Sequence, residues 1–403
     1  MPRAGWVKPH SDQRLSDHIS IGLLTRSYPP ELVDRVLAEQ GRTERRKRLL
    51  PARVMVYYAM ALALFSEGSY EEVMRNLVEG LDWQSGWQRP WRVPSQVAIT
   101  KARSRLGSEP VRALYERVAR PLARSQSKGA FLGDLRLMAV DGTTFDLADT
   151  PANEAAFGRP GSGRGEGRAA YPQLRAVGLA ECGTHAILDV ALGPIKRGEG
   201  SLAAQLWGSL EPGMLLLADR GFWDFKAFKA AKASGAELLW RVPKNLNLAV
   251  CEALEDGSYR SRIYASADRK HVEPIEVRVV EYELDDPALG SERYRLATTL
   301  LDPGAASATE LAAAYPQRWE FETVLDELKT HQRGPRLVLR SRTPEGVRQE
   351  VYGYLLTHYA IRALMHEVAI DVGRDPDRLS FTRSLRVVRR SARAGPGFSP
   401  HSA

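Results

Sequence analysis

The sequence predicts a mixed α/β sheet domain that carries a strand-rich insertion and follows an all-helical first domain. Three observations predict this architecture. Residues 29–125 combine helix-capping residues with helical periodicity. From Leu135 onward, short apolar runs typical of buried strands alternate with helical segments. Residues 244–305 are rich in β-branched and aromatic residues at strand spacing, as in IEVRVVEYEL and RYRLATTLL.

The first domain is predicted from proline and capping signals. Residues 1–28 carry no such pattern and are predicted to be irregular. Ser69 with Glu72 forms a capping-box pattern, and Ser95 is placed to cap a further helix. The predicted helices cover 30–40, 51–67, 70–81 and 95–107. A helix-turn-helix and a plain helical bundle with a basic surface both fit this pattern.

The sheet domain is predicted over 131–243 and 306–370, on either side of the insertion. One apolar strand, LRLMAVDG, runs into Asp141, and a second, MLLLADRG, ends at Asp219. Further strands are predicted at 173–180, 184–192 and 236–243, and helices at 200–210, 222–234, 307–330 and 345–369. Residues 371–403 are predicted to form a basic helix, 378–392, and a tail.

The composition favours a protein of the cytoplasm with a polyanionic partner. Lys and Arg exceed Asp and Glu by 8 in 403 residues. Cys182 and Cys251 lie far apart, which argues against a disulfide framework and against a zinc site of the cysteine type. The N-terminal segment lacks the apolar core of a secretory signal, and the longest apolar run, 54–65, is too short to cross a bilayer. We therefore expect a cytoplasmic protein with no membrane association.

Four residues in AYPQRWEFETVLDELKTH form one narrow stripe if the segment is a helix. They lie within about 60° of one another at 100° per residue, and they are Tyr315, Arg318, Glu322 and Lys329. Arg and Lys bind phosphate oxygens, Tyr adds a hydroxyl, and Glu is a hard ligand for a divalent cation. A solvent-exposed helix face with an ion pair between Arg318 and Glu322 is the simpler alternative.

The two strand-end aspartates favour the metal interpretation. Asp141 and Asp219 each precede a glycine-containing turn, and active sites of open α/β sheets lie just beyond strand ends. Taken singly, each aspartate could be an ordinary turn residue. Together with Glu322 they supply three hard carboxylates, which suit two Mg²⁺ or Mn²⁺ ions engaged in phosphoryl transfer.

These residues resemble the DDE transposases of the insertion-sequence-four type. The matching motifs are VDGTTFD, ADRGF and Y-x2-R-x3-E-x6-K, with RRKRLLP, SYEEV and ARSRLG in the helical region and LSFTRSLRVVRRS near the C-terminus. The resemblance implies a ribonuclease-H-like catalytic domain with Asp141, Asp219 and Glu322 as catalytic metal ligands. It also implies that Tyr315, Arg318 and Lys329 contact phosphates at the transposon end.

The resemblance further implies the reaction and its partners. Such an enzyme cleaves double-stranded DNA at terminal inverted repeats and joins the freed 3′ hydroxyls to target DNA, as a homodimer on paired ends and in association with a bacterial nucleoid. A host-recruited DNA-binding protein and a stand-alone metal-dependent nuclease of the same fold remain as alternatives.

Five further residues are predicted to contact DNA or a displaced base. Tyr294, in the insertion, is the candidate stacking partner for a flipped base, with Trp240 as second choice and core packing as the alternative for both. Arg164 lies in the glycine-rich loop GRPGSGRGEGR, which could follow a DNA backbone or be a solvated loop. Lys101 and Arg103 belong to the basic surface of the first domain.

Overall fold

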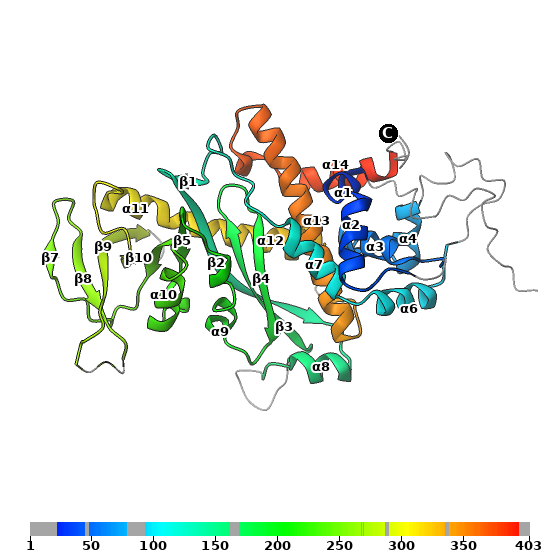
Figure 1. Ribbon diagram of the computed structural model, residues 1–403, viewed down its shortest axis with the longest axis horizontal. Helices are drawn as coiled ribbons and strands as arrows, with labels where there is room; N and C mark the ends of the chain where they lie inside the picture. The colour runs from blue at the N-terminus through cyan, green and yellow to red at the C-terminus, as the bar shows by residue number, and fades with distance from the viewer. Residues whose placement is uncertain are drawn as a thin grey trace, which may run out of the picture.

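The computed structural model describes residues 22–394 apart from 45–47, 79–92, 162–168, 267, 269, 287–289 and 335–337. Helices gather at one end of an elongated molecule and strands at the other, and the long helix α13 (Pro344–Asp371) runs along the junction (Figure 1). No helix within the described ranges is long and apolar enough to span a bilayer.

The N-terminal region is helical, as predicted. Its helices are α1 (Gly22–Ser27), α2 (Pro30–Glu39), α3 (Ala52–Leu64), α4 (Tyr70–Val78), α6 (Gln96–Leu106) and α7 (Glu109–Val118). The prediction of an irregular segment over 1–28 is wrong for α1, which packs on α13 and α14 (Phe381–Ala394) and buries Leu24. The remainder of that segment, 1–21, lies outside the described residues, as does the predicted helix end at 79–81.

Helix α3 joins this region to the rest of the molecule. Every residue of α3 except Arg53 is buried, because the helix is covered by its neighbours α2, α4, α6 and α7 and by α13. The crossing with α13 is close: a Cβ added at Gly353 would stand 2.4 Å from the carbonyl oxygen of Ala59. One hydrophobic core therefore continues from the N-terminal helices through α13 to one face of the sheet.

The centre of the sheet has the ribonuclease-H-like arrangement, which confirms the predicted fold class. Its strands are β2 (Leu135–Leu147), β3 (Gln173–Glu181), β4 (Ile187–Pro194), β5 (Met214–Ala218) and β6 (Glu237–Arg241), in the order β4-β3-β2-β5-β6. The first three are antiparallel neighbours, whereas β5 and β6 run parallel to β2. Helices α8 (Pro151–Phe157), α9 (Glu199–Ala203) and α10 (Phe225–Lys232) connect these strands.

The strand-rich segment 244–305 continues the same sheet. Its strands are β7 (Glu252–Ala253), β8 (Tyr259–Ile263), β9 (Ile275–Asp286) and β10 (Gly290–Thr298), and β10 pairs antiparallel with β6. With the short strands β1 (Phe131–Leu132) and β11 (Val338–Leu339), the described chain forms one sheet of eleven strands.

The helix predicted over 307–330 is wrong as a single element. It consists of α11 (Ala308–Ala314), a 3₁₀ turn η4 (Tyr315–Trp319), α12 (Glu320–Asp326) and a π-helical turn η5 (Glu327–Gln332). Pro316 explains the first change, because it has no N–H to donate and its ring disfavours a continuous α-helix. The four residues of the predicted stripe therefore come from three different local helices.

Candidate active site

Asp141 and Asp219 lie side by side on neighbouring strands. β2 and β5 are parallel with Val140 opposite Ala218, so each aspartate is the next residue along its strand. The prediction that Asp141 ends its strand is wrong, because β2 continues for six residues past Asp141. This part of β2 stays paired with β3, in which Gly178 lies opposite Asp141. Asp219 directly follows Ala218, the last residue of β5, so Asp141 lies level with the end of the shorter strand.

The carboxyl group of Asp141 is half-buried and lies among other acidic groups. Burial is the main cause of its raised pKa, and the negative charges of Glu322 and Glu199 raise it further. The amide of Gly142 donates to Oδ1 at 2.7 Å, and the Nη1 atom of Arg318 lies 3.9 Å from Oδ2. These two groups lower the pKa without cancelling the rise. Additional positive charge is therefore favourable here.

Asp219 is held by groups from two elements, β6 and η4. Nη1 of Arg241 lies 3.9 Å from Oδ1, and the hydroxyl of Tyr315 donates to the same oxygen at 3.4 Å. The indole N–H of Trp240 donates to the backbone carbonyl of Asp219 at 3.1 Å. Tyr315 is almost fully buried, and burial raises the pKa of its hydroxyl, so it stays protonated as a donor.

Lys329 and Arg318 approach the aspartates from the helical segment. Nζ of Lys329 donates to Oγ1 of Thr143 at 3.0 Å, two residues past Asp141 on β2. Burial, followed by the charge of Arg333, lowers the pKa of Lys329. The guanidinium of Arg318 is buried, yet its Nε has no hydrogen-bond partner. A buried, unpaired donor is costly, and an incoming phosphate oxygen would satisfy it.

Glu322 is exposed on α12. Its charge acts on Asp141, but the three predicted metal ligands do not form a tight group. Within the described ranges, a different trio has ligand atoms that all lie within 4.8 Å of one another: His185, Glu320 and Asp377. The oxygens of the three predicted ligands therefore do not all lie within that distance of one another, although Glu322 is near enough for its charge to raise the pKa of Asp141.

Tyr294 is not available as a stacking partner for a base in this structure. Arg241 covers one side, with its guanidinium carbon 3.9 Å from the ring centroid, and Tyr282 stacks on the ring with centroids 5.3 Å apart. Trp240 is fully buried among other aromatic rings. Both predictions are therefore corrected: the two rings are core residues that support Arg241 and Asp219.

Arg103 is also corrected, because its guanidinium is buried and fully engaged. It donates to the side chains of Gln349, Tyr70 and Ser341, at 2.8, 2.9 and 3.0 Å, and to the Gly346 carbonyl. It therefore joins α6 to the start of α13. Lys101 is exposed on the same helix and stays a predicted DNA contact. Arg164 lies outside the described residues.

Arg103 and Lys101 should respond differently to substitution. Arg103→Met should lower the free energy of unfolding by about 3 kcal/mol, because it leaves buried partners without a charged donor. Lys101→Ala should leave stability unchanged and lower the salt dependence of DNA binding by about one counterion. Urea unfolding and binding titrations at several salt concentrations measure both. A loss of stability in Lys101→Ala, or none in Arg103→Met, would contradict these assignments.

Two residues near the aspartates were not predicted. Glu199, the first residue of α9, lies against Gly142, where an added Cβ would stand 2.8 Å from its Cδ. Trp319 is 49% exposed beside Arg318, whose guanidinium carbon lies 4.6 Å from the indole ring centroid. The sequence did contain a signal for Trp319, because this tryptophan directly follows the arginine of the motif. Glu199 carried no comparable signal, because its approach depends on the fold.

Comparisons with known proteins identify the family. Residues 18–116 match the insertion element 4 transposase N-terminal family, and residues 132–359 match the transposase DDE domain. The chain is 32% identical over 374 residues to "Transposase InsG for insertion sequence element IS4" of Escherichia coli (strain K12), covering 92% of this chain and 83% of that protein. It is 26% identical over 267 residues to "Putative transposase InsZ" of the same organism, covering 65% and 84%.

A solved structure is also similar. It is a piggyBac transposase synaptic complex with hairpin DNA, at 11% identity and a TM-score of 0.45, covering 94% of this chain and 81% of that one. The fold and the family matches define a metal-dependent DDE transposase. The chain belongs to the insertion-element-four transposase family.

Proposed function

We propose that this protein cleaves DNA at the terminal inverted repeats of its element and joins the freed 3′ hydroxyls to target DNA. The observation that carries the proposal is the position of Asp141 and Asp219 on paired, parallel strands, with Arg318 and Lys329 beside them. Water is the attacking group in cleavage, and the 3′ hydroxyl is the attacking group in joining. Both steps are in-line displacements at phosphorus.

The donor set fits a divalent cation, and we propose two Mg²⁺ ions, with Mn²⁺ as a substitute. Asp141, Asp219 and Glu322 would hold them, because all three offer hard carboxylate oxygens. Burial raises the pKa of Asp141, and the charges of Glu322 and Glu199 add to the rise, so a cation bound here would stabilise the ionised carboxylate. When bound, such ions polarise the phosphate and increase the acidity of the attacking water.

The neighbouring side chains would bind and orient the DNA. Arg318 has an unpaired Nε for a phosphate oxygen, and Lys329 adds a positive charge at the β2 side of the site. Tyr315 and Arg241 hold Asp219 in place from the other side. Two copies of the chain acting on paired ends would let both ends be joined to one target, and we include this arrangement in the proposal.

Incubation with labelled repeat DNA tests the proposal. The DNA flanking the gene supplies the inverted repeats, and a supercoiled plasmid supplies the target. We expect Mg²⁺-dependent cleavage at the repeat and joined products, both absent from Asp219→Ala. Cleavage without joining would indicate a stand-alone nuclease. Binding without cleavage in either Mg²⁺ or Mn²⁺ would indicate a recruited DNA-binding protein.

Trp319 is the aromatic residue that we propose in place of Tyr294 for stacking on a displaced base. Its indole is exposed next to Arg318, whereas both faces of Tyr294 are covered. Stacking of a base on an aromatic ring is worth about 1–3 kcal/mol, so Trp319→Ala should slow repeat cleavage by about 10- to 100-fold. Trp319→Phe should retain most activity. A 2-aminopurine placed at the repeat end reports the unstacked base, and unchanged rates and fluorescence in Trp319→Ala would exclude this role.

A further inference from the structure

A second cluster of ligand-type side chains lies behind the catalytic helix, and we call it the rear cluster: His185, Glu320 and Asp377. His185 comes from the turn between β3 and β4, Glu320 is the first residue of α12, and Asp377 lies in the short turn η6 (Pro376–Arg378) between α13 and α14. Two residues turn a helix by about 200°, so Glu320 points away from the face that presents Glu322. The rear cluster is therefore separate from the proposed catalytic ions.

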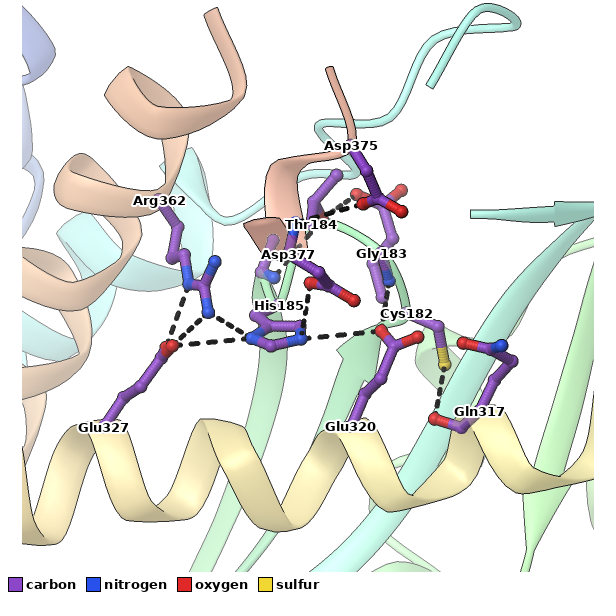
Figure 2. Close-up of polar contacts among 12 residues, drawn as sticks. Cys182, Gly183, Thr184, His185, Gln317, Glu320, Glu327, Arg362, Asp375 and Asp377 are labelled. Atoms are coloured by element: carbon purple, nitrogen blue, oxygen red, sulfur yellow. Dashed lines mark hydrogen bonds and ion pairs between the residues drawn. The ribbon is translucent and has the colours of Figure 1, made fainter. Parts of the chain in front are cut away.

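The ring of His185 is buried and aimed between the two carboxylates (Figure 2). Its Nε2 lies 2.9 Å from a carboxylate oxygen of Asp377 and 3.5 Å from one of Glu320. Both contacts are at ion-pair distance, but Nε2 is buried and makes no well-formed hydrogen bond to either oxygen. A buried polar atom of this kind needs a partner.

The separations match the edges of a metal coordination shell. With ligand bonds of about 2.1 Å, neighbouring ligand atoms lie about 3.0 Å apart in an octahedral site and about 3.4 Å apart in a tetrahedral one. We propose that the rear cluster binds one divalent transition-metal ion of the Zn²⁺ type. One imidazole with two carboxylates favours such an ion over Mg²⁺, which prefers oxygen ligands alone.

The second nitrogen of His185 faces a group that can orient the ring. Oε1 of Glu327 lies 3.6 Å from Nδ1, and Glu327 also bonds to Arg362 (Figure 2). His358 forms a further hydrogen bond with Glu327. Histidine ligands of metals commonly donate from the other ring nitrogen to a carboxylate, which fixes the ring. The guanidinium of Arg362 contacts Nδ1 as well. For Nδ1 to donate to Glu327, this guanidinium would have to turn away from the ring and bond to Glu327 alone, with which it already forms two hydrogen bonds.

The charges also favour a dication. Glu320, Asp377 and Glu327 supply three carboxylates around this ring, and Arg362 is the permanent cation in contact with Glu327. The His358 ring is buried, and burial lowers its pKa, so it is neutral. Burial and the charge of Arg362 oppose protonation of His185, yet its contacts with Asp377, Glu320 and Glu327 raise its pKa to about 10. A divalent ion would replace the proton on Nε2, and with a neutral His185 it would balance the charge of the group. Asp377 keeps 31% of its side chain exposed, which gives an ion a path from solvent.

Such an ion would tie three distant segments together. It would link the β3–β4 turn and the η6 turn to the first residue of α12, two positions before Glu322. The ion would thus fix the start of the helix that carries a catalytic carboxylate, from the side opposite to the DNA.

Zinc binding by the untagged, full-length protein tests the proposal without DNA. We would use chelator-stripped Asp219→Asn, in which the proposed catalytic pair is impaired, and titrate Zn²⁺ by calorimetry. One equivalent should bind and raise the melting temperature. Adding Asp377→Asn or His185→Gln should remove that equivalent, whereas Asp371→Asn, an exposed carboxylate at the end of α13, should retain it. An equivalent that persists in Asp377→Asn would overturn the proposal.

X-ray absorption at the zinc edge gives an answer that does not depend on the folding of the variants. The zinc-loaded Asp219→Asn protein should show one imidazole ligand with oxygen ligands at about 2.0–2.2 Å. A shell without imidazole, or no bound zinc after dialysis, would show that Nε2 holds a proton and no metal. Because no cleavage is measured, this outcome is separate from that of the proposed transposase activity.

Discussion

Replacing Glu322 with Gln should abolish repeat cleavage while leaving repeat binding within about threefold of the wild-type value. The amide keeps the shape of the side chain but removes the charge that would hold a metal ion. We expect a rate loss of at least about a thousandfold, or about 4 kcal/mol in activation free energy. Glu322 is exposed, so folding should be unaffected.

A matched control is available one turn further along the same helix. Asp326 is an exposed carboxylate that already pairs with His331, 3.2 Å away. Asp326→Asn should therefore cleave at the wild-type rate. Gel-shift titration and single-turnover cleavage of one labelled fragment give both quantities. Loss of repeat binding in Glu322→Gln would show that its role is not purely catalytic.

Gly353→Ala should cause a large loss of stability, although it adds only one methyl group. The added Cβ would stand 2.4 Å from the Ala59 carbonyl oxygen and 2.9 Å from its carbon, so α3 and α13 must move apart. Both helices are buried at this crossing, and overpacking of this kind costs about 3 kcal/mol. The free energy of unfolding in urea measures the effect.

The control for this variant is Gly200→Ala. Gly200 lies in α9 with no atom within 4 Å of an added Cβ, so its free energy of unfolding should change by less than about 0.5 kcal/mol. Equal stability of the two variants would show that the α3–α13 crossing is looser than the structure indicates.

The sequence predicted the sheet because its strands are marked by local composition. MLLLA and LRLMAV are apolar runs of strand length, and the aspartates that follow them are polar residues at the expected edge. The motif Y-x2-R-x3-E-x6-K placed Tyr315, Arg318 and Lys329 at the site even though the prediction of a single continuous helix is wrong. Pro316 was a readable sign of that break.

What the sequence did not predict depends on contacts between distant segments. β2 continues past Asp141 because β3 pairs with it, and no local signal records that pairing. Arg103 has the pattern of a surface cation, yet Gln349 and Ser341, more than two hundred residues away, accept its hydrogen bonds. Tyr294 does lie on a strand, as predicted, but the covering of its two faces by Arg241 and Tyr282 follows from sheet packing.

Metal rescue of cysteine variants tests the central claim, that Asp141 and Asp219 ligate the catalytic ions, most directly. Mn²⁺ accepts a sulfur ligand more readily than Mg²⁺ does. Asp141→Cys and Asp219→Cys should fail to cleave the repeat in Mg²⁺ and recover part of the activity in Mn²⁺. Asp224→Cys, at the N-cap of α10, should be active in both ions. Failure of both site variants to recover in Mn²⁺, with folding intact, would contradict direct ligation by these aspartates.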